Sequence, residues 1–283
     1  MNREEIGEFL YRFYRKRTSS FLANIYKASI TGESKDIHRA RLDVKKIFAL
    51  YGLFEMLAPE IFENQGGYRL FRPLYRQAGK IREIQVNFLL LALTQPMGNA
   101  YDSFTQWLRG EEQQSVKKFL QLIKKFKDRE LTATDKVIQK ICHSSSIFKL
   151  RSKTKAYIRH KAALIQELQV NEPGDKEIHR IRQNLKEMSA ITTLVYSIKP
   201  AEQLDLIMSA LNQSEMLIGD WHDRVVLKEA IVRFLKGHPA EPEEELKVLN
   251  QLKLELNDQK QDLIQKFMPE VNAIVTSILL ENG

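Results

Sequence analysis

The sequence predicts an all-α protein made of two similar halves, and three observations support this class. Apolar residues recur at three- and four-residue spacing through almost every segment, which is typical of amphipathic helices. Alternating β-branched residues, the usual signal of strands, are scarce. Two short motifs also recur in the same order in the second half of the chain, which indicates an internal duplication.

Prolines and glycines divide the chain into about ten helices, several of them longer than about twenty residues. The breaks are, in chain order, Pro59, Gly66 with Gly67, Pro96 with Gly98, Pro173 with Gly174, Pro200, and residues 237–242. Pro269 should kink or end the last long helix, because proline lacks a backbone donor and clashes with the preceding turn. Long helices with short connections pack as antiparallel bundles.

The repeat defines the two halves. Ile37–Lys45 and Ile178–Lys186 are identical at five of nine positions, namely Ile, His, two Arg and Lys. Gly79–Val86 and Gly219–Val226 then share the pattern G-x-x-x-[ED]-x-x-V. These matches predict two antiparallel bundles of about four long helices each, related by a pseudo-twofold axis. We expect one domain over residues 1–283, with a first repeat at 1–132 and a second at 133–283.

Composition indicates a soluble protein with an anionic partner. The 283 residues are 43% hydrophobic, which is enough for a sizeable core, and 44 Lys and Arg against 36 Asp and Glu give a net charge of +8. The single cysteine, Cys142, cannot form an intramolecular disulfide, and the N-terminal residues show no apolar signal segment, so we expect the cytoplasm. The longest apolar run, Phe88–Leu93, is far shorter than the roughly 20 residues of a membrane span.

The first repeated motif places positive charges in a stripe. A helix turns about 100° per residue, so His38, Arg41 and Lys45 fall within an arc of roughly 60°. The apolar residues of the same segment occupy the adjoining arc, so the stripe should border the core and line a groove between helices. The same geometry repeats for His179, Arg182 and Lys186, and the two stripes could oppose each other.

These stripes contain no acidic residue, whereas ordinary solvated helix faces mix signs. A third basic stretch has no Asp or Glu either, and its mutual repulsion would be relieved by a bound anion. It comprises Arg69, Arg72, Arg76, Lys80 and Arg82. Further candidates for the lining of the same site come from the first long helix of each half: Arg17, Lys155 and Arg159. The pattern therefore favours an anion-binding site over a plain surface.

The two H-x-x-R-x-x-x-K segments, each followed by G-x-x-x-[ED]-x-x-V, resemble the duplicated pattern of the CHAD family (conserved histidine α-helical domain) over nearly the whole chain. The resemblance implies two four-helix bundles around a central basic pore that holds inorganic polyphosphate, with no catalysis, cofactor or metal. The phosphate ligands it implies are His38, Arg41, Lys45, Lys46, His179, Arg182 and Lys186. Glu187 and Ser189 replace basic residues that are common in the family, so the second site should be the weaker.

Other functions stay open at this point. Nucleic-acid binding is the main alternative, although Tyr68, Phe71 and Tyr75 have the spacing of core residues rather than of base-stacking aromatics. A metal-chelating or phosphoacceptor histidine domain and a protein scaffold are further alternatives. His222 stands between Asp220 and Asp223 at an expected helix start, where aspartate is a common cap. Polyphosphate granules in the cytoplasm are the expected location.

Overall fold

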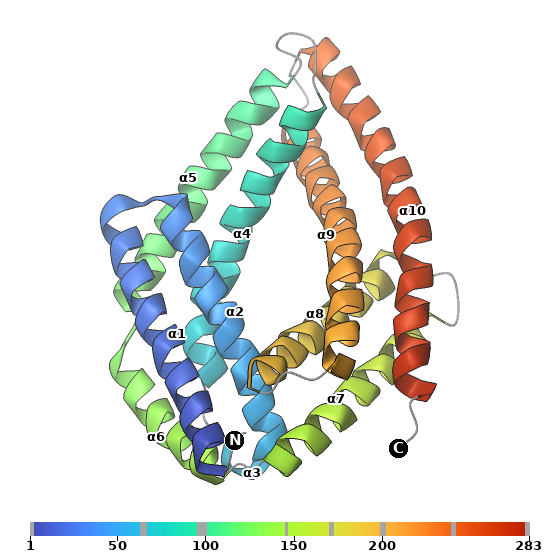
Figure 1. The fold of residues 1–283 in the computed structure, drawn as a ribbon. Coiled ribbons are helices and arrows are strands. Elements are labelled where there is room, and N and C mark those ends of the chain that lie inside the picture. Colours follow the sequence, from blue (N-terminus) through green and yellow to red (C-terminus); the bar gives the residue numbers. More distant parts are fainter. Residues whose placement is uncertain are drawn as a thin grey trace.

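The computed structural model describes residues 3–62, 67–94, 101–144, 147–169, 173–198, 202–238 and 242–280. These residues form ten α-helices and contain no strand, which confirms the all-α prediction (Figure 1). The helices are α1 (Arg3–Thr31), α2 (Ser34–Leu57), α3 (Pro59–Phe62), α4 (Gly67–Leu93), α5 (Asp102–Lys125), α6 (Arg129–Ser144), α7 (Ile147–Leu168), α8 (Asp175–Ile198), α9 (Glu202–Gly237) and α10 (Glu243–Leu280).

Several helix ends lie at the predicted prolines and glycines. Pro59 opens α3 and Gly67 opens α4. Gly32, which was not among the predicted breaks, ends α1: it has a φ of 65°, and its N–H donates to the carbonyl of Ala28 at 2.8 Å. This left-handed conformation favours glycine and turns the chain into α2. The predicted breaks at Gly66, Pro96, Gly98 and Pro200 lie outside the described residues.

The last long helix contradicts one of the two outcomes predicted for Pro269, namely that the helix ends there. α10 does not end at Pro269 but continues to Leu280. Phe267 and Val271, on either side of the proline, are buried in a cluster shared with α7, α8 and α9. This packing offsets the hydrogen bond that the proline removes. α4 likewise continues through Pro73.

Three hydrophobic clusters hold the helices together. The first joins α1, α2, α4 and α6, and it includes the C-terminal end of α8. The second joins α7, α8, α9 and α10 around Trp221. The third joins α4 and α5 to α9 and α10, where the rings of Phe104 and Phe234 are 5.2 Å apart. The core is therefore shared between the two predicted halves.

α2 and α8 correspond to each other in the predicted repeat, and each has 24 residues. They pack together near Gly52, where an added Cβ would lie 3.6 Å from Cδ1 of Ile191. From this crossing their N-terminal halves diverge, and α4 and α9 rise on opposite sides of the centre (Figure 1). The duplication, its pseudo-twofold axis and its boundary at 132/133 stay predictions. That boundary falls within α6, which packs against α1.

By length and composition, α10 could cross a membrane, and it is the one helix of the described residues that meets this test. The expectation from the sequence considered only uninterrupted apolar runs and missed this helix. Residues along α10, from Leu249 to Ile278, are buried in the second and third clusters. Packing within the protein therefore accounts for much of its apolar character.

Candidate functional site

The predicted stripe of α2 lies at the edge of the first core. His38, Arg41 and Lys45 are half-buried, whereas Ile37 and Val44 beside them are buried. Burial lowers the pKa of His38, and the charges of Arg82 and Arg41 lower it further. His38 therefore favours the neutral form near pH 7.

The predicted stripe of α8 has the same arrangement. His179, Arg182 and Lys186 are half-buried beside the buried Ile178 and Leu185. Burial lowers the pKa of Lys186 to about 8, and the charge of Arg182 adds to this shift. Burial also lowers the pKa of His179, again with a contribution from Arg182. The positive charges of this stripe are therefore close together in a partly desolvated environment.

The ends of the two stripes that lie nearer the crossing of α2 and α8 act on each other. Burial lowers the pKa of Arg182, the carboxylate of Asp223 opposes this shift, and Arg41 of α2 adds to it. Lys45 of α2 likewise helps to lower the pKa of Lys186 after burial and Arg182. Charges on different helices must lie close together to act on one another in this way. Arg41 and Lys45 are therefore close to Arg182 and Lys186, and the opposition of the two whole stripes stays a prediction.

α4 covers the first stripe. Cζ of Arg41 lies 5.0 Å from the centre of the Tyr75 ring, which is a cation–π contact. One turn further along α4, Gly79 lies beside the guanidinium, since an added Cβ would be in van der Waals contact with Nε of Arg41 at 3.8 Å. Arg82 and Glu83 follow on the same face of α4 another turn later.

α9 covers the second stripe. The ring centres of His179 and His222 are 5.6 Å apart. Burial lowers the pKa of His222 to about 3, and the charges of Arg182 and His179 contribute. His222 is therefore neutral near pH 7 although it lies among cations.

The expected helix start at His222 is wrong. α9 runs without a break from Glu202 to Gly237, so Asp220 and Asp223 lie inside the helix and are not caps. Trp221, which is 1% exposed, anchors this part of α9 in the second cluster. Burial of that side chain makes a continuous helix more favourable than the capped start that the local sequence suggested.

We call this set of basic side chains the central basic site. Its members are His38, Arg41, Lys45, Arg82, His179, Arg182, Lys186 and His222. Within the described residues, none of them forms an ion pair with a carboxylate. Nδ1 of His38 and of His222 and Nε of Arg41 and of Arg182 are buried without a hydrogen-bond partner there. The Nε–H groups of Arg41 and Arg182 are thus buried donors without partners, which is costly, so the site has the capacity to bind acceptors.

Four carboxylates act on these cations without pairing with them, and one of them is Glu229, whose charge acts on His179. Burial raises the pKa of Glu83, and Arg41 opposes the shift. Burial also raises the pKa of Asp223, and Arg182 opposes it. Glu215, two turns before Asp223 on α9, acts on Arg182 and Lys186. The site is therefore basic but not purely so.

No family model matches this chain, and no curated protein matches it. Among solved structures, the crystal structure of the CHAD domain from the plant Ricinus communis is similar over 99% of this chain and 92% of that chain, with a TM-score of 0.68. The chain has the CHAD-domain fold. The sequence identity is 13%, so the comparison shows the fold alone. The roles of individual residues in this CHAD fold depend on their own geometry.

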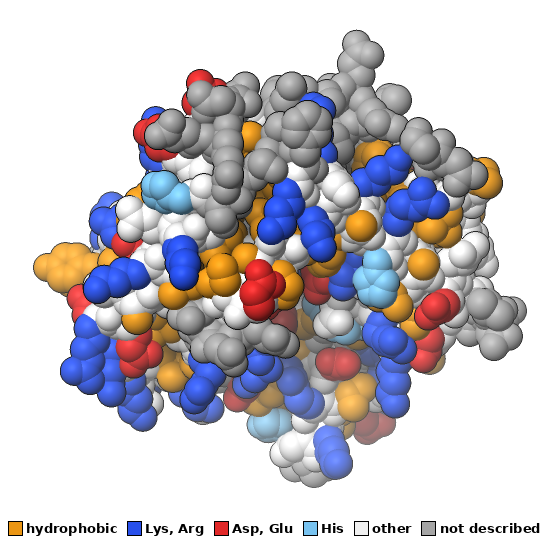
Figure 2. Space-filling model, turned by 90° about the horizontal axis from the view of Figure 1, so that it is seen from below, with side chains coloured by type: hydrophobic (Ala, Val, Ile, Leu, Met, Phe, Trp, Pro, Cys, Tyr) orange, Lys and Arg blue, Asp and Glu red, His pale blue; other side chains and the backbone are white. Residues whose placement is uncertain are grey.

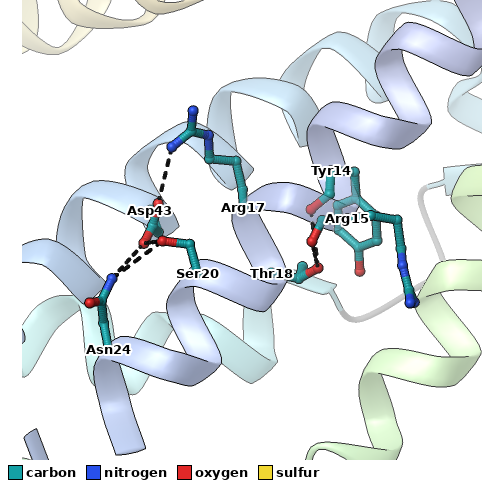
Figure 3. A network of polar contacts seen from close by, with 7 residues as sticks. All are labelled: Tyr14, Arg15, Arg17, Thr18, Ser20, Asn24 and Asp43. Carbon is teal, nitrogen blue, oxygen red and sulfur yellow. Dashed lines mark hydrogen bonds and ion pairs between the residues drawn. The ribbon is translucent and has the colours of Figure 1, made fainter. Parts of the chain in front are cut away.

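Some residues predicted to line the site have other contacts in the CHAD fold. Arg17 donates to the buried carboxylate of Asp43, which also accepts from Ser20 and Asn24 (Figure 3). Arg159 donates to the carbonyl of Leu279. Arg17 therefore helps to join α1 to α2, and Arg159 joins α7 to α10.

The remaining predicted residues are exposed. Arg69 lines a separate cavity of about 600 Å³ between α4, α5 and α6. Surface positions are also found for Lys46, Arg72, Arg76, Lys80 and Lys155. On the face shown in Figure 2, Lys and Arg side chains are spread widely instead of forming one patch. The role of Lys46 as a phosphate ligand, and of the others as secondary basic lining of the site, stays a prediction.

The aromatic residues near the basic stretch of α4 lie in the core of the CHAD fold. Phe71 is fully buried, with its ring 5.1 Å from that of Phe21. The Tyr68 ring lies 5.3 Å from that of Tyr51, and the Tyr75 ring packs against Phe48 and Arg41. This confirms the expectation that their spacing indicates core residues.

Four residues of the site were not singled out as such from the sequence: His222, Glu83, Asp223 and Glu215. The repeat held the signal for the first three, because aligning Gly79 with Gly219 pairs Arg82 with His222 and Glu83 with Asp223. Glu215 has no such signal, since the aligned residue is Tyr75. Among the described residues, no group of three His, Cys, Asp or Glu side chains is arranged to hold a metal ion.

Proposed function

We propose that this protein binds inorganic polyphosphate, or a polyanion of similar charge density, at the central basic site and performs no chemistry on it. The observation that carries the proposal is the convergence of two stripes from α2 and α8, whose Arg41, Lys45, Arg182 and Lys186 have no ion-pair partner among the described residues. Each stripe alone would be a basic surface. Together they form a site whose positive charge is complementary to that of a multivalent anion.

Polyphosphate suits this site for physical reasons. Arginine donates bidentate, charge-assisted hydrogen bonds to phosphoryl oxygens, and lysine acts as a compact point charge. A hydrogen bond to a charged group contributes roughly 1.5–3 kcal/mol. Stripes on two diverging helices offer contacts to successive phosphoryl groups, which a single phosphate could not satisfy at once. A linear chain of phosphates is therefore the preferred ligand.

The absence of catalysis is part of the proposal. Cys142 is buried in the first core, where desolvation raises the pKa of its thiol to about 12, so it is a poor nucleophile. The charges that act on the site histidines His38 and His222 come from cations, which do not activate a nucleophile. The cytoplasm, and polyphosphate granules within it, are the proposed location, since one cysteine requires no oxidising compartment.

Nucleic-acid binding remains the alternative that the experiment must separate. Any cationic site attracts a phosphate backbone through counterion release. Reading of single strands usually adds aromatic side chains that stack on bases. Here Tyr68, Phe71 and Tyr75 pack within the protein, which favours polyphosphate.

The test is a competition titration of the full chain with long-chain polyphosphate against single- and double-stranded DNA at about 150 mM salt, near physiological ionic strength. The variants are His38→Ala/Arg41→Ala and Arg41→Ala/Arg182→Ala, and the matched control is Arg39→Ala/Arg180→Ala. Arg39 and Arg180 lie on the same two helices but are exposed.

We expect wild type and the control to prefer polyphosphate, and the site variants to lose at least about tenfold in affinity, which corresponds to about 1.4 kcal/mol. Circular dichroism and thermal unfolding verify that the variants fold. Equal or tighter binding of DNA by the wild type, or site variants that bind like the control, would overturn the proposal.

A further inference from the structure

The second stripe faces a carboxylate that the first stripe lacks. Glu215, Gly219 and Asp223 follow each other at intervals of four residues, so they share one face of α9. The contact between His222 of α9 and His179 of α8 orients this part of α9 toward the second stripe. Glu215 is therefore placed beside Arg182 and Lys186, on which its charge acts.

Glu215 is close to these cations but not bonded to them. Its Oε1 atom is buried and has no hydrogen-bond partner among the described residues. Nε of Arg182 is likewise buried and has no hydrogen-bond partner among them. A buried carboxylate oxygen without a donor is unfavourable, and nearby positive charge offsets part of this cost. The carboxylate thus partly neutralises the charge of the second stripe without accepting a hydrogen bond from its side chains.

The first stripe has a different partner at the aligned position. Tyr75 aligns with Glu215 when Gly79 is aligned with Gly219, and its uncharged ring stacks on Arg41. Glu83 and Asp223 are aligned acids, one in each half. The charge of Glu229 also acts on His179, so the second stripe faces three nearby carboxylates, whereas the first faces one. This difference makes the two stripes unequal as anion sites.

We propose that Glu215 is a built-in counter-anion that competes with bound polyphosphate for Arg182 and Lys186. The proposal rests on the proposed function of the central basic site. It makes Glu215 a residue that sets affinity: polyphosphate binds first along His38, Arg41 and Lys45 of α2. When polyphosphate then binds the α8 stripe, the electrostatic attraction between Glu215 and its two cations is lost.

The charge can be removed without changing the shape of the side chain. Glu215→Gln removes the negative charge, and Glu215→Tyr introduces the residue type of the aligned position. The control is Glu243→Gln, at the exposed start of α10, which changes the net charge of the protein by the same amount. Affinity for long-chain polyphosphate is measured by calorimetry with the full chain at about 150 mM salt, and thermal unfolding is measured without ligand.

We expect Glu215→Gln and Glu215→Tyr to bind polyphosphate about tenfold more tightly than wild type. Glu215→Gln should also melt at a lower temperature without ligand, because Arg182 and Lys186 lose a compensating charge. A residue with a merely structural role would lower affinity and stability together. In an Arg182→Ala/Lys186→Met background the gain in affinity should disappear.

The two proposals fail in different ways. If wild type binds polyphosphate in a manner that depends on Arg41 and Arg182, but both Glu215 variants bind like Glu243→Gln, the role of Glu215 is wrong and the proposed function stands. A Glu215→Gln variant that binds more weakly than wild type also refutes it. If wild type shows no binding that depends on Arg41 and Arg182, the proposed function itself fails.

Discussion

His179 of α8 and His222 of α9 lie with their ring centres 5.6 Å apart, and the pKa of each is lowered. Burial is the main cause for both, and Arg182 contributes to both shifts. A histidine pair beside an arginine cannot become doubly protonated without strong repulsion unless an anion is present. Under the proposed function, the pair would couple the protonation of the site to the binding of the anion.

Protonation of His222 should destabilise the free protein in acid. Its pKa is about 3 in the folded state and about 6.5 in an unfolded chain, so the unfolded state binds more protons between these values. Stability should fall as the pH is lowered from about 6.5 toward about 3. His222→Gln should reduce this loss by about 1–2 kcal/mol in urea unfolding at pH 4.5 compared with pH 7. His160→Gln, on the exposed surface of α7, is the control, and equal acid sensitivity of both variants would contradict the prediction.

Polyphosphate binding should tighten as the pH falls from 8 to 5.5. The pKa values of His38 and His179 are lowered in the free protein, by burial and by neighbouring arginines, and a bound polyanion would raise them again. The complex then binds more protons than the free protein, so a lower pH favours it. Titration in two buffers of different ionisation enthalpy would detect this proton uptake. An affinity that is constant across the range would disprove the coupling.

Replacement of Lys186 should raise stability and weaken binding. Burial lowers the pKa of Lys186 to about 8, which means that its charge is unfavourable in the folded state. Between about pH 8 and 10.5 the unfolded chain binds more protons, and below this range the cost is fully present. Lys186→Met should stabilise the protein by about 1 kcal/mol at pH 7 and reduce polyphosphate affinity. Lys176→Met, exposed on the same helix, should leave stability nearly unchanged; a destabilised Lys186→Met would refute the argument.

The buried carboxylate of Asp43 should matter more than an exposed one. Asp43 accepts hydrogen bonds from Oγ of Ser20 at 2.7 Å and Nδ2 of Asn24 at 2.9 Å, and it pairs with Arg17 at 3.4 Å (Figure 3). Asp43→Asn leaves Arg17 without its charge partner and should destabilise the protein by about 2 kcal/mol. In the same urea titrations Glu8→Gln, which removes an exposed ion pair, should cost less than about 0.5 kcal/mol. Similar values for the two variants would exclude a joining role for Asp43.

Gly7 should tolerate no side chain, because α1 and α6 approach each other closely there. A Cβ on Gly7 would collide with the carbonyl of Cys142, which belongs to the backbone and cannot move aside alone. Gly7→Ala should therefore destabilise the protein by about 1–3 kcal/mol. Gly110→Ala in α5 has open space and should stabilise it by about 0.5–1 kcal/mol, since alanine is the better helix former. Thermal unfolding that moves both variants in the same direction would contradict this contrast.

The sequence by itself determined the helices and the two stripes. The spacing of apolar residues is a local property, so the all-α class and the positions of His38, Arg41 and Lys45 beside the core follow from it. The same holds for the aligned residues of α8. The local signal for a helix start at His222 was misleading, and α10 does not end at Pro269; long-range packing of Trp221 and Phe267 keeps these helices continuous.

Only the tertiary structure decided which charges meet. The crossing of α2 and α8 near Gly52 depends on which apolar faces pack together, and that choice is not encoded in the period of either helix. Burial then lowers the pKa values of His222 and Lys186. The fold also places Glu215 near Arg182, although the repeat gave no signal for Glu215. Periodicity fixes where a side chain points on its own helix. The neighbours that determine its charge and its partners come from other helices, far away along the chain.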